Sequence, residues 1–545
     1  MALSFEPLPV PSVLPDNFLP VALPYALTPR SDQFLPVIEA ATGAVLASVR
    51  ADRLLSGDFE LPVHDRAGLL FGPPMSQSGT RAASVPTAQR EKTLQKAIIG
   101  VIDLGFAFWN PRFRSLPDSG FAGIAFLNFE PDAAGGGSAL EPEELDGAAL
   151  AQLVQLPGGE VAIRAELRAQ FPRSIHGDGP LGGAPFWHGT AMAELAAPPN
   201  VPLFGLELPR AVLEDSTGGT LEAVIAPAIR TLVSMMMRHP LAGSDTQLLI
   251  LAGFAFTGGP RDGSRPGVKA LRAVLDDPAF GRVKLVLPMG NHGAEPCVLL
   301  DVEGPMVWTL PPDDHSANTL DLFPAGSPSA LVLSEPGGAE VRLELGPEPR
   351  LAQVLSAGRL IGLIWSRPGS EGSARIRITL NGTAAGPAVV QPGSWTVALD
   401  GADSRTRTCD AWLLRDDRPL SDRREAPFRQ AALHLAGAIP PVGRGQSGSG
   451  HARVGTASAL ASAQDGVGVV AVGALERAWP GGDARRANYS GRFSDGQRTE
   501  AAAMLVDAEG PGRGTLALGG GGARLYRVSG TSVAAALHVH ALAGG

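Results

Sequence analysis

The stretch Ala97-Ile-Ile-Gly-Val-Ile-Asp103-Leu-Gly105 most constrains how this chain folds. It is a short, continuous apolar run that ends in an acid and a glycine. A run of this kind is typical of a strand buried on both faces in a parallel sheet. Asp103 then lies at the carboxyl edge of the sheet, where ligands and catalytic groups collect in α/β folds. For a lone aspartate, a helix cap or turn is the competing interpretation.

The chain after residue 200 alternates strand-like and helix-like segments, which predicts right-handed βαβ units and a parallel sheet. These segments are strand Val201–Leu208, helix Leu221–Arg238, strand Leu248–Phe254, helix Gly267–Leu275 and strand Val283–Leu287. We expect Pro227 to kink the first helix or to mark its effective start. The last strand runs directly into Pro288-Met-Gly-Asn291, so Asn291 is also expected at the carboxyl edge.

From Val298 to about Asp416 the pattern changes to short β-prone runs separated by turn residues, which predicts an inserted all-β sandwich. The runs are Met306–Leu310, Ala330–Leu333, Ala339–Leu345, Leu360–Trp365, Ala374–Leu380 and Ser394–Leu399. Pro440–Gly450 is a Gly/Ser linker, and Val467–Gly473 resumes the buried-strand pattern.

The predicted fold class is therefore α/β, with a parallel sheet flanked by helices and interrupted by an inserted all-β, sandwich-like domain. We expect four segments: 1–90 as an N-terminal module or arm with a linker, 91–297 and 441–545 as the two parts of the α/β domain, and 298–440 as the insert. The first segment is Pro-rich and ends in a polar, turn-forming run.

Charge and apolar patterning exclude some partners. The 545 residues hold 54 acidic and 45 basic side chains, a net charge of -9, which argues against nucleic acid or an anionic membrane as the main partner. The longest apolar runs are far shorter than a membrane helix, and prolines interrupt every candidate secretory signal. Two cysteines, Cys297 and Cys409, are too few for a disulfide-rich scaffold, although the sequence leaves open that these two pair with each other. A cytoplasmic protein is expected.

The C-terminal stretch Tyr526–Ala541 reads as a loop that delivers Ser532 onto the first turn of an alanine-rich helix. Gly530 permits a tight entry, and a helix N-terminus favours developing negative charge. Ser532 is the candidate nucleophile. A small-residue helix is also typical of plain core.

His188 stands just before Gly189-Thr190 and a helix-prone run, although a lone histidine is usually a surface or satisfied core residue. Asp103, His188, Asn291 and Ser532 follow one another in that order, each at a strand end or a helix start.

The words around these four residues resemble the motifs of subtilisin-like serine proteases, the subtilases. They are Val101-Ile-Asp103-Leu-Gly, His188-Gly-Thr, Gly290-Asn291-His-Gly and Gly530-Thr-Ser532-Val-Ala-Ala. Val469–Leu475 and Ala487–Arg492 also look like the strand and turn that precede the serine in that family. The resemblance covers roughly residues 95–297 and 450–545.

The resemblance implies a serine endopeptidase that acts on polypeptides through an acyl-enzyme. His188 would take the proton of Ser532 as general base, and Asp103 would fix its tautomer. The Asn291 amide and the backbone N–H of Ser532 would hold the oxyanion. No cofactor is required, and a structural calcium ion is expected only by family resemblance. Residues 1–90 are a candidate pro-segment or permanent cap.

The sequence also departs from the family. Trp187 stands where a glycine usually precedes the histidine, Ala191 replaces a usual second histidine, and Ala536 replaces a usual proline. By resemblance the specificity walls hold Gly253 and Phe254 on one side and Met289 and Gly290 on the other. Pro288 and Met289 are bulky there, so a narrowed S1 pocket is expected.

Two other functions compete with an active peptidase whose β insert gates substrates or binds a protein partner. One is a catalytically weak or silent subtilase-fold protein that binds a peptide or partner. The other is an esterase, against which the lack of a G-x-S-x-G word counts; Gly445–Ser449 is a near miss. The run Asp313-Asp314-His315 could suggest a metal site, but a polar turn is the preferred interpretation. The segment 177–182 matches the dinucleotide-binding pattern G-x-G-x-x-G, but it follows no clear strand, so we discard that interpretation.

Overall fold

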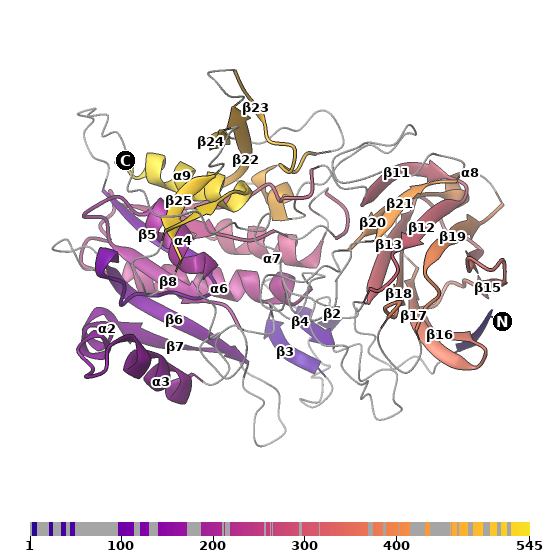
Figure 1. Cartoon of the computed structure of the whole chain (residues 1–545), viewed down its shortest axis with the longest axis horizontal. Coiled ribbons are helices and arrows are strands. Elements are labelled where there is room, and N and C mark those ends of the chain that lie inside the picture. The colour runs from indigo at the N-terminus through magenta and orange to yellow at the C-terminus, as the bar shows by residue number, and fades with distance from the viewer. Residues whose placement is uncertain are drawn as a thin grey trace.

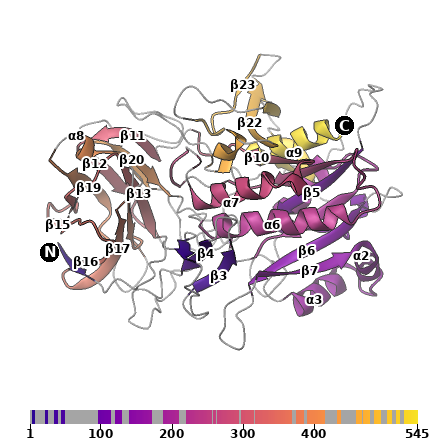
Figure 2. The same cartoon turned by 180° about the vertical axis from the view of Figure 1, so that it is seen from behind.

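The computed structural model of the chain contains a mixed α/β part and a β sandwich that lie beside each other (Figures 1 and 2). The described residues are 3–7, 21–24, 34–39, 44–49, 96–113, 120–129, 140–171, 187–209, 212, 219–255, 258–261, 263, 265–293, 297–314, 317–368, 374–384, 389–402, 404–414, 431–436, 458, 460–465, 468–477, 483–493, 502–508, 514–519 and 525–544.

A nine-stranded sheet forms the centre of the α/β part, in the order β23-β22-β10-β9-β5-β8-β6-β7, with β24 also paired to β22. Its strands are β5 (Ala97–Asp103), β6 (Phe121–Phe129), β7 (Leu140–Asp146), β8 (Leu203–Glu207), β9 (Gln247–Ala252), β10 (Val283–Pro288), β22 (Val469–Arg477), β23 (Ala484–Arg486) and β24 (Ala502–Ala508). All neighbours are parallel except the edge strands β7 and β23, which pair antiparallel. The parallel sheet expected from the alternating pattern is therefore present.

Helices cover both faces of this sheet. They are α4 (His188–Ala196), α6 (Gly219–Met237), α7 (Pro266–Leu275) and α9 (Thr531–Leu542). α4 and α9 pack on each other and on one face, and α6 and α7 lie on the other face, as the two opposite views show (Figures 1 and 2). The hairpin of β25 (Thr515–Leu518) and β26 (Leu525–Val528) leads into α9. α6 continues through Pro227, so this proline does not mark the helix start.

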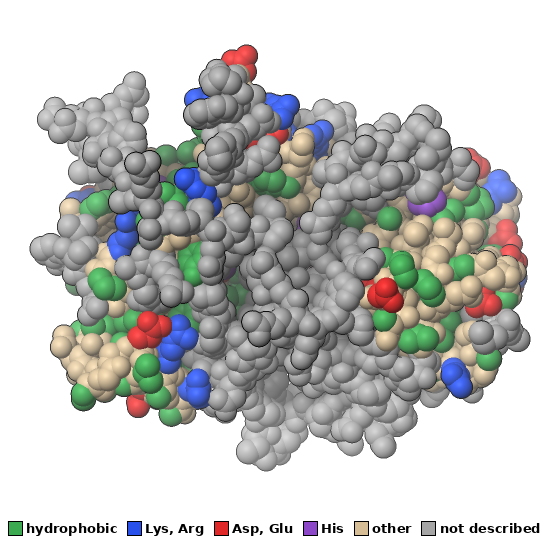
Figure 3. All heavy atoms as spheres, in the orientation of Figure 1, with side chains coloured by type: hydrophobic (Ala, Val, Ile, Leu, Met, Phe, Trp, Pro, Cys, Tyr) green, Lys and Arg blue, Asp and Glu red, His purple; other side chains and the backbone are tan. Residues whose placement is uncertain are grey.

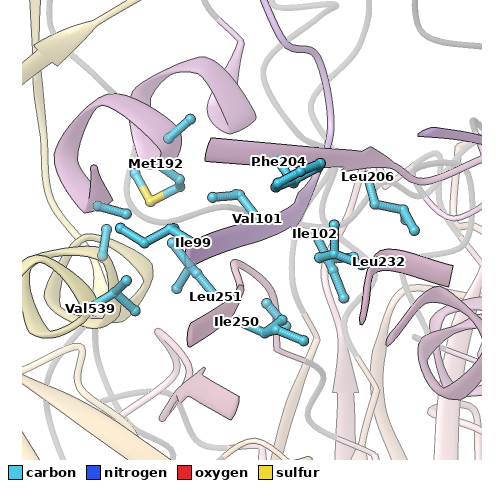
Figure 4. Close-up of a cluster of buried hydrophobic side chains, with 14 of the residues drawn as sticks. Ile99, Val101, Ile102, Met192, Phe204, Leu206, Leu232, Ile250, Leu251 and Val539 are labelled. Carbon is cyan, nitrogen blue, oxygen red and sulfur yellow. The ribbon is translucent and has the colours of Figure 1, made fainter. Parts of the chain in front are cut away.

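The core lies between the sheet and these helices. Every residue of β5 is buried, which explains its unbroken apolar run. Ile99 and Val101 lie near Met192 of α4 and Val539 of α9, whereas Ile102 lies near Leu232 of α6 (Figure 4). Because neighbouring residues of a strand point to opposite faces, one strand supplies both cores.

The stretch between Phe106 and Ala184 holds structure that the sequence pattern did not predict. After β6, strand β7 returns antiparallel and leads into α2 (Gly147–Val154) and α3 (Glu160–Gln170). Asp146 caps α2 by accepting from the N–H of Ala149 at 2.8 Å. α3 buries Ile163 and Leu167, which are four residues apart on one face.

The sandwich consists of two antiparallel sheets that share one core. The seven-stranded sheet has the order β1-β16-β17-β18-β13-β20-β11 and the five-stranded sheet has the order β15-β14-β19-β12-β21. The strands are β11 (Val298–Glu303), β12 (Met306–Leu310), β13 (Asn318–Pro324), β14 (Ala330–Ser334), β15 (Glu340–Glu344), β16 (Arg350–Ser356), β17 (Arg359–Arg367), β18 (Arg375–Leu380), β19 (Gly393–Asp400), β20 (Thr408–Leu413) and β21 (Ala432–Leu435). Trp308 and Trp395 of one sheet and Ile378 of the other are fully buried in that core.

Buried charges and thiols are also found in the sandwich. Asp321 accepts from Arg375 and Arg377 at 2.6 to 2.8 Å, and these two arginines hold the pKa of Asp321 well below its usual range despite complete burial. Cys297 and Cys409 lie at opposite ends of the β11–β20 pair and do not form a disulfide with each other. Burial and the nearby Asp410 raise the pKa of the Cys409 thiol to about 12.

The N-terminal strands do not form one separate arm. β1 (Leu3–Pro7) pairs antiparallel with β16 and is the edge strand of the seven-stranded sheet. β2 (Val21–Pro24), β3 (Phe34–Glu39) and β4 (Ala44–Val49) form a small sheet of their own, in which β3 and β4 contact α6. The predicted linker at 73–90 falls outside the described residues.

The remaining described elements are short. They are η1 (Pro111–Phe113), η2 (Pro278–Phe280), η4 (Leu460–Asp465) and α8 (Ser404–Arg407). On the face in Figure 3, acidic, basic and apolar side chains are interspersed over the described parts. Among the described helices there is none with the length and apolarity needed to span a bilayer.

Candidate active site

Three of the predicted site residues meet at the carboxyl edge of the central strand. Asp103 is the last residue of β5, His188 is the first residue of α4, and Ser532 lies in the first turn of α9. His188 and Ser532 are 344 positions apart in the chain, yet their side chains are in hydrogen-bond contact. The packing of α4 against α9 on one face of the sheet brings them together.

The contacts form one continuous chain. The Nδ1 atom of His188 is 2.8 Å from both carboxylate oxygens of Asp103, and its Nε2 atom is 3.0 Å from the Ser532 Oγ. An ionised carboxylate can only accept, so Nδ1 carries the proton. In the neutral ring Nε2 then has a free lone pair, which faces the serine hydroxyl.

The chain of contacts is almost completely enclosed. The exposed fractions of Asp103, His188 and Ser532 are 0%, 8% and 3%. Asp103 Oδ1 also accepts from the N–H of Leu104 at 2.7 Å. Exclusion of water strengthens hydrogen bonds of this kind and makes their loss costly.

Backbone contacts join the aspartate and histidine segments directly. The N–H of Gly189 donates to the Leu104 carbonyl at 2.9 Å. The Thr190 hydroxyl donates to the Gly105 carbonyl at 3.0 Å and accepts from the N–H of Ala107 at 2.9 Å. The Thr190 hydroxyl therefore satisfies one backbone carbonyl and one backbone N–H of the segment that follows Asp103, and it ties that segment to the start of α4.

Gly253 directly supports this pair of residues. A Cβ at this position would lie 2.1 Å from Asp103 Oδ2 and 3.3 Å from His188 Cε1. Only a glycine leaves room for the carboxylate. Gly253 thus packs closely beneath Asp103 and His188, and its contact with substrate stays a prediction.

Asn291 is held by the residue that precedes the serine. Its Oδ1 accepts from the Thr531 N–H at 2.8 Å and from the Thr531 hydroxyl at 3.0 Å. Because the backbone N–H can only donate, the contacting atom of Asn291 is the oxygen. The Thr531 hydroxyl in turn accepts from the N–H of Gly290 at 3.0 Å. This network leaves the amide NH₂ of Asn291 as its remaining donor.

A turn around Tyr489 connects the asparagine loop to the start of α9. The N–H of Gly530 donates to the Tyr489 hydroxyl at 3.2 Å, and the N–H of Gly293 donates to the Tyr489 carbonyl at 2.8 Å. Gly530 has φ 138° and ψ 164°, which a residue with a side chain rarely adopts. Sequence reasoning named neither Tyr489 nor Thr531 as a site residue, although both fall in words quoted for the resemblance.

The expected specificity residues are packed inside the molecule. Phe254 is 2% exposed within the main core, and Met289 is fully buried against Ala461, Ala471 and Phe493. Gly290 has φ 96°, which only glycine adopts readily. Neither large side chain offers an open surface to a peptide in this arrangement.

The geometry is suited to nucleophilic chemistry at Ser532. A hydroxyl next to the lone pair of a neutral imidazole can lose its proton to that ring, and a carboxylate on the far side stabilises the resulting imidazolium. The oxygen of the Asn291 side chain is held by Thr531, and its amide NH₂ is a hydrogen-bond donor. Within the described part of the chain, no group of three or more His, Cys, Asp or Glu side chains is arranged to hold a metal ion.

Comparison with known proteins gives a structural neighbour. No protein-family model and no curated protein matches the sequence. The structure of the Clostridium perfringens CspB protease is similar over 83% of this chain and 82% of its own, with a TM-score of 0.52 and 15% identity. At this identity the likeness concerns the fold: a mixed α/β sheet flanked by helices with additional antiparallel sheets.

Proposed function

We propose that this chain is a serine endopeptidase of the subtilisin type that hydrolyses polypeptides through Asp103, His188 and Ser532. The observation that carries the proposal is the hydrogen-bonded chain from Asp103 through His188 to Ser532, with contacts of 2.8 and 3.0 Å. The likeness to a protease structure is consistent with peptidase activity.

The proposed reaction has two halves. His188 Nε2 accepts the Ser532 proton as Oγ attacks the peptide carbonyl, and the Asn291 amide and the Ser532 N–H donate to the oxyanion. The C–N bond breaks as the imidazolium returns its proton to the leaving amine. Water, deprotonated by the same ring, then hydrolyses the acyl-enzyme and regenerates the serine. No metal or organic cofactor takes part, and a structural calcium ion remains an expectation from the resemblance.

A second candidate is a silent member of the same fold that binds a peptide or protein partner. The 3% exposure of Ser532 favours it, because a nucleophile must be reached by its substrate. Residues 1–90 as a pro-segment or cap would reconcile that burial with an active enzyme. Both remain proposals.

The sandwich is proposed to gate substrates or to bind a protein partner, and its contacts with the α/β part support a coupled role. The Arg261 guanidinium lies 5.4 Å from the Trp412 ring centroid, and a Cβ on Gly258 would lie 2.4 Å from Leu414. The two contacts join β20 and the residue that follows it, Leu414, to the segment after Gly253. The buried Arg265–Glu222 ion pair anchors the same segment to α6.

The test is labelling with a fluorophosphonate, which reacts with activated serines. We expect the wild type to be labelled, and Ser532→Ala and His188→Ala to be unlabelled although folded. Ser394→Ala, an exposed serine on β19, is the matched control and should label normally. A folded protein that resists the probe and cleaves no casein, both as the full chain and after removal of residues 1–90, would refute the endopeptidase and favour the binding module.

A further inference from the structure

Two tryptophans mark the two segments that carry Asp103 and His188. Trp187 immediately precedes His188, and Trp109 follows Asp103 by six positions on the segment that leaves β5. Their rings meet edge to face, with centroids 5.5 Å apart and an angle of 89°. Both side chains are buried, with exposed fractions of 1% and 3%.

Trp187 is fixed on two other sides. Gly105 packs so closely against it that a Cβ there would lie 2.8 Å from the Trp187 Cβ and Cγ, and Gly105 has φ 74°. The N–H of Trp187 donates to the Gly519 carbonyl at 2.5 Å, at the end of β25. The tryptophan that replaces the expected glycine is thus a packing element that touches two other segments, 105–109 and the end of β25.

Arg164 of α3 contacts both rings. Its guanidinium carbon lies 4.5 Å from the Trp187 centroid and 6.0 Å from the Trp109 centroid. Glu160, one turn earlier on α3, pairs with Arg164 at 2.7 Å. The Arg164 side chain is 22% exposed, so water only partly screens the attraction of the cation to the rings.

We propose that Arg164 is a positioning residue that clamps the aspartate and histidine segments together through Trp109 and Trp187. One cation attracts a ring from each segment, so the two segments cannot separate without loss of at least one of these contacts. The clamp sets the separation of Asp103 and His188 and thereby the aim of His188 Nε2 at Ser532. This inference rests on the proposed function for its kinetic consequence, and it gives the β7-α2-α3 excursion a role in that site.

The experiment uses the full-length protein with Arg164→Ala, Arg164→Lys and the control Arg168→Ala. Arg168 is an exposed arginine of the same helix, so its replacement has a similar effect on helix propensity. Fluorophosphonate labelling rates per folded molecule report serine activation, and peptide kinetics separate kcat from KM. The downfield proton resonance of His188 Nδ1 reports the Asp103 contact without any turnover.

We expect Arg164→Ala to lower the labelling rate and kcat about tenfold, with KM within about twofold, because a small misplacement of catalytic groups is costly. Arg164→Lys keeps the cation and should recover most of the rate, and Arg168→Ala should match the wild type. Equal labelling of Arg164→Ala and wild type, or equal losses in Arg164→Ala and Arg168→Ala, would overturn the clamp. If the wild type itself is not labelled, the proposed function fails separately. The clamp then stands if the Nδ1 resonance shifts or broadens in Arg164→Ala alone, and falls if it is unchanged.

Discussion

Gly253→Ala is the change that tests most directly whether the Asp103–His188 contact drives activity. The residue lies at the end of β9, directly beneath the carboxylate, and it makes no contact with Ser532 in the described network. The substitution adds a single methyl group. Its effect therefore comes through Asp103 and His188.

The size of the effect follows from the distances. The new methyl carbon would lie 2.1 Å from Asp103 Oδ2, whereas real contacts of this kind stay above 3.0 Å. The carboxylate must therefore move by about 1 Å, which at a catalytic centre costs on the order of 100-fold in rate. That factor corresponds to about 2.7 kcal/mol of transition-state stabilisation.

The assay is the second-order rate of fluorophosphonate labelling together with kcat/KM on a peptide substrate, and thermal unfolding serves as a check on the fold. Gly337→Ala is the matched control, because a Cβ there would meet its nearest atoms at 3.7 and 3.9 Å. We expect normal activity for Gly337→Ala and about 100-fold less for Gly253→Ala. A folded Gly253→Ala protein with the wild-type rate would refute the reasoning that the carboxylate must hold its place.

Three further changes test other parts of the structure. Thr531→Val removes the hydroxyl that holds Asn291 and should lower kcat about 10- to 100-fold with little change in KM, whereas Thr531→Ser should retain activity; equal kcat values would contradict the assigned role. Asp321→Asn leaves two buried arginines without a carboxylate partner, so chemical denaturation should show a free energy of unfolding lower by about 3 to 5 kcal/mol. An unchanged denaturation midpoint would contradict this prediction. Burial raises the pKa of Glu194, with Arg112 opposing it, so the folded state binds its proton more tightly than the unfolded state. Stability should therefore fall as the pH rises from 4.5 through the folded-state pKa, and Glu194→Gln should flatten that part of the pH–stability curve.

The central sheet and the order of the site residues could be predicted from the sequence because both leave local signals. Buried parallel strands are continuous apolar runs, and β5, β9 and β10 agree with the predicted strands to within two residues. Several sandwich strands were predicted as well, such as β12 at Met306–Leu310. Asp103 ends a strand and His188 and Ser532 lie at helix starts, as the sequence predicts, and their grouping into one site was expected from the resemblance to the subtilases.

The rest depends on contacts between distant segments. Gly253 packs against Asp103 because β9 pairs with β5, which lies far earlier in the chain. The burial of Met289 depends on Ala461 and Phe493, which lie far along the chain. The apolar residues of Glu160–Gln170 recur with helical spacing, but that spacing does not predict the contact between Arg164 of α3 and the distant Trp187.

The pairing of β12 with β21 has a consequence for how the chain assembles. Met306 lies opposite Leu435, and the N–H of Ala436 donates to the Pro305 carbonyl at 3.3 Å, so the segment from β12 to β21 begins and ends at neighbouring places. Contacts such as Thr531 to Asn291 are 240 positions apart and carry the entropy cost of closing a long loop. If this segment folds first, the loop between Asn291 and Thr531 shortens from 240 to about 110 positions, which lowers that cost by about 0.7 kcal/mol. Early folding of the insert therefore lowers the entropy cost of joining the two parts of the α/β sheet. This favours a folding order in which the insert forms before Ser532 meets His188.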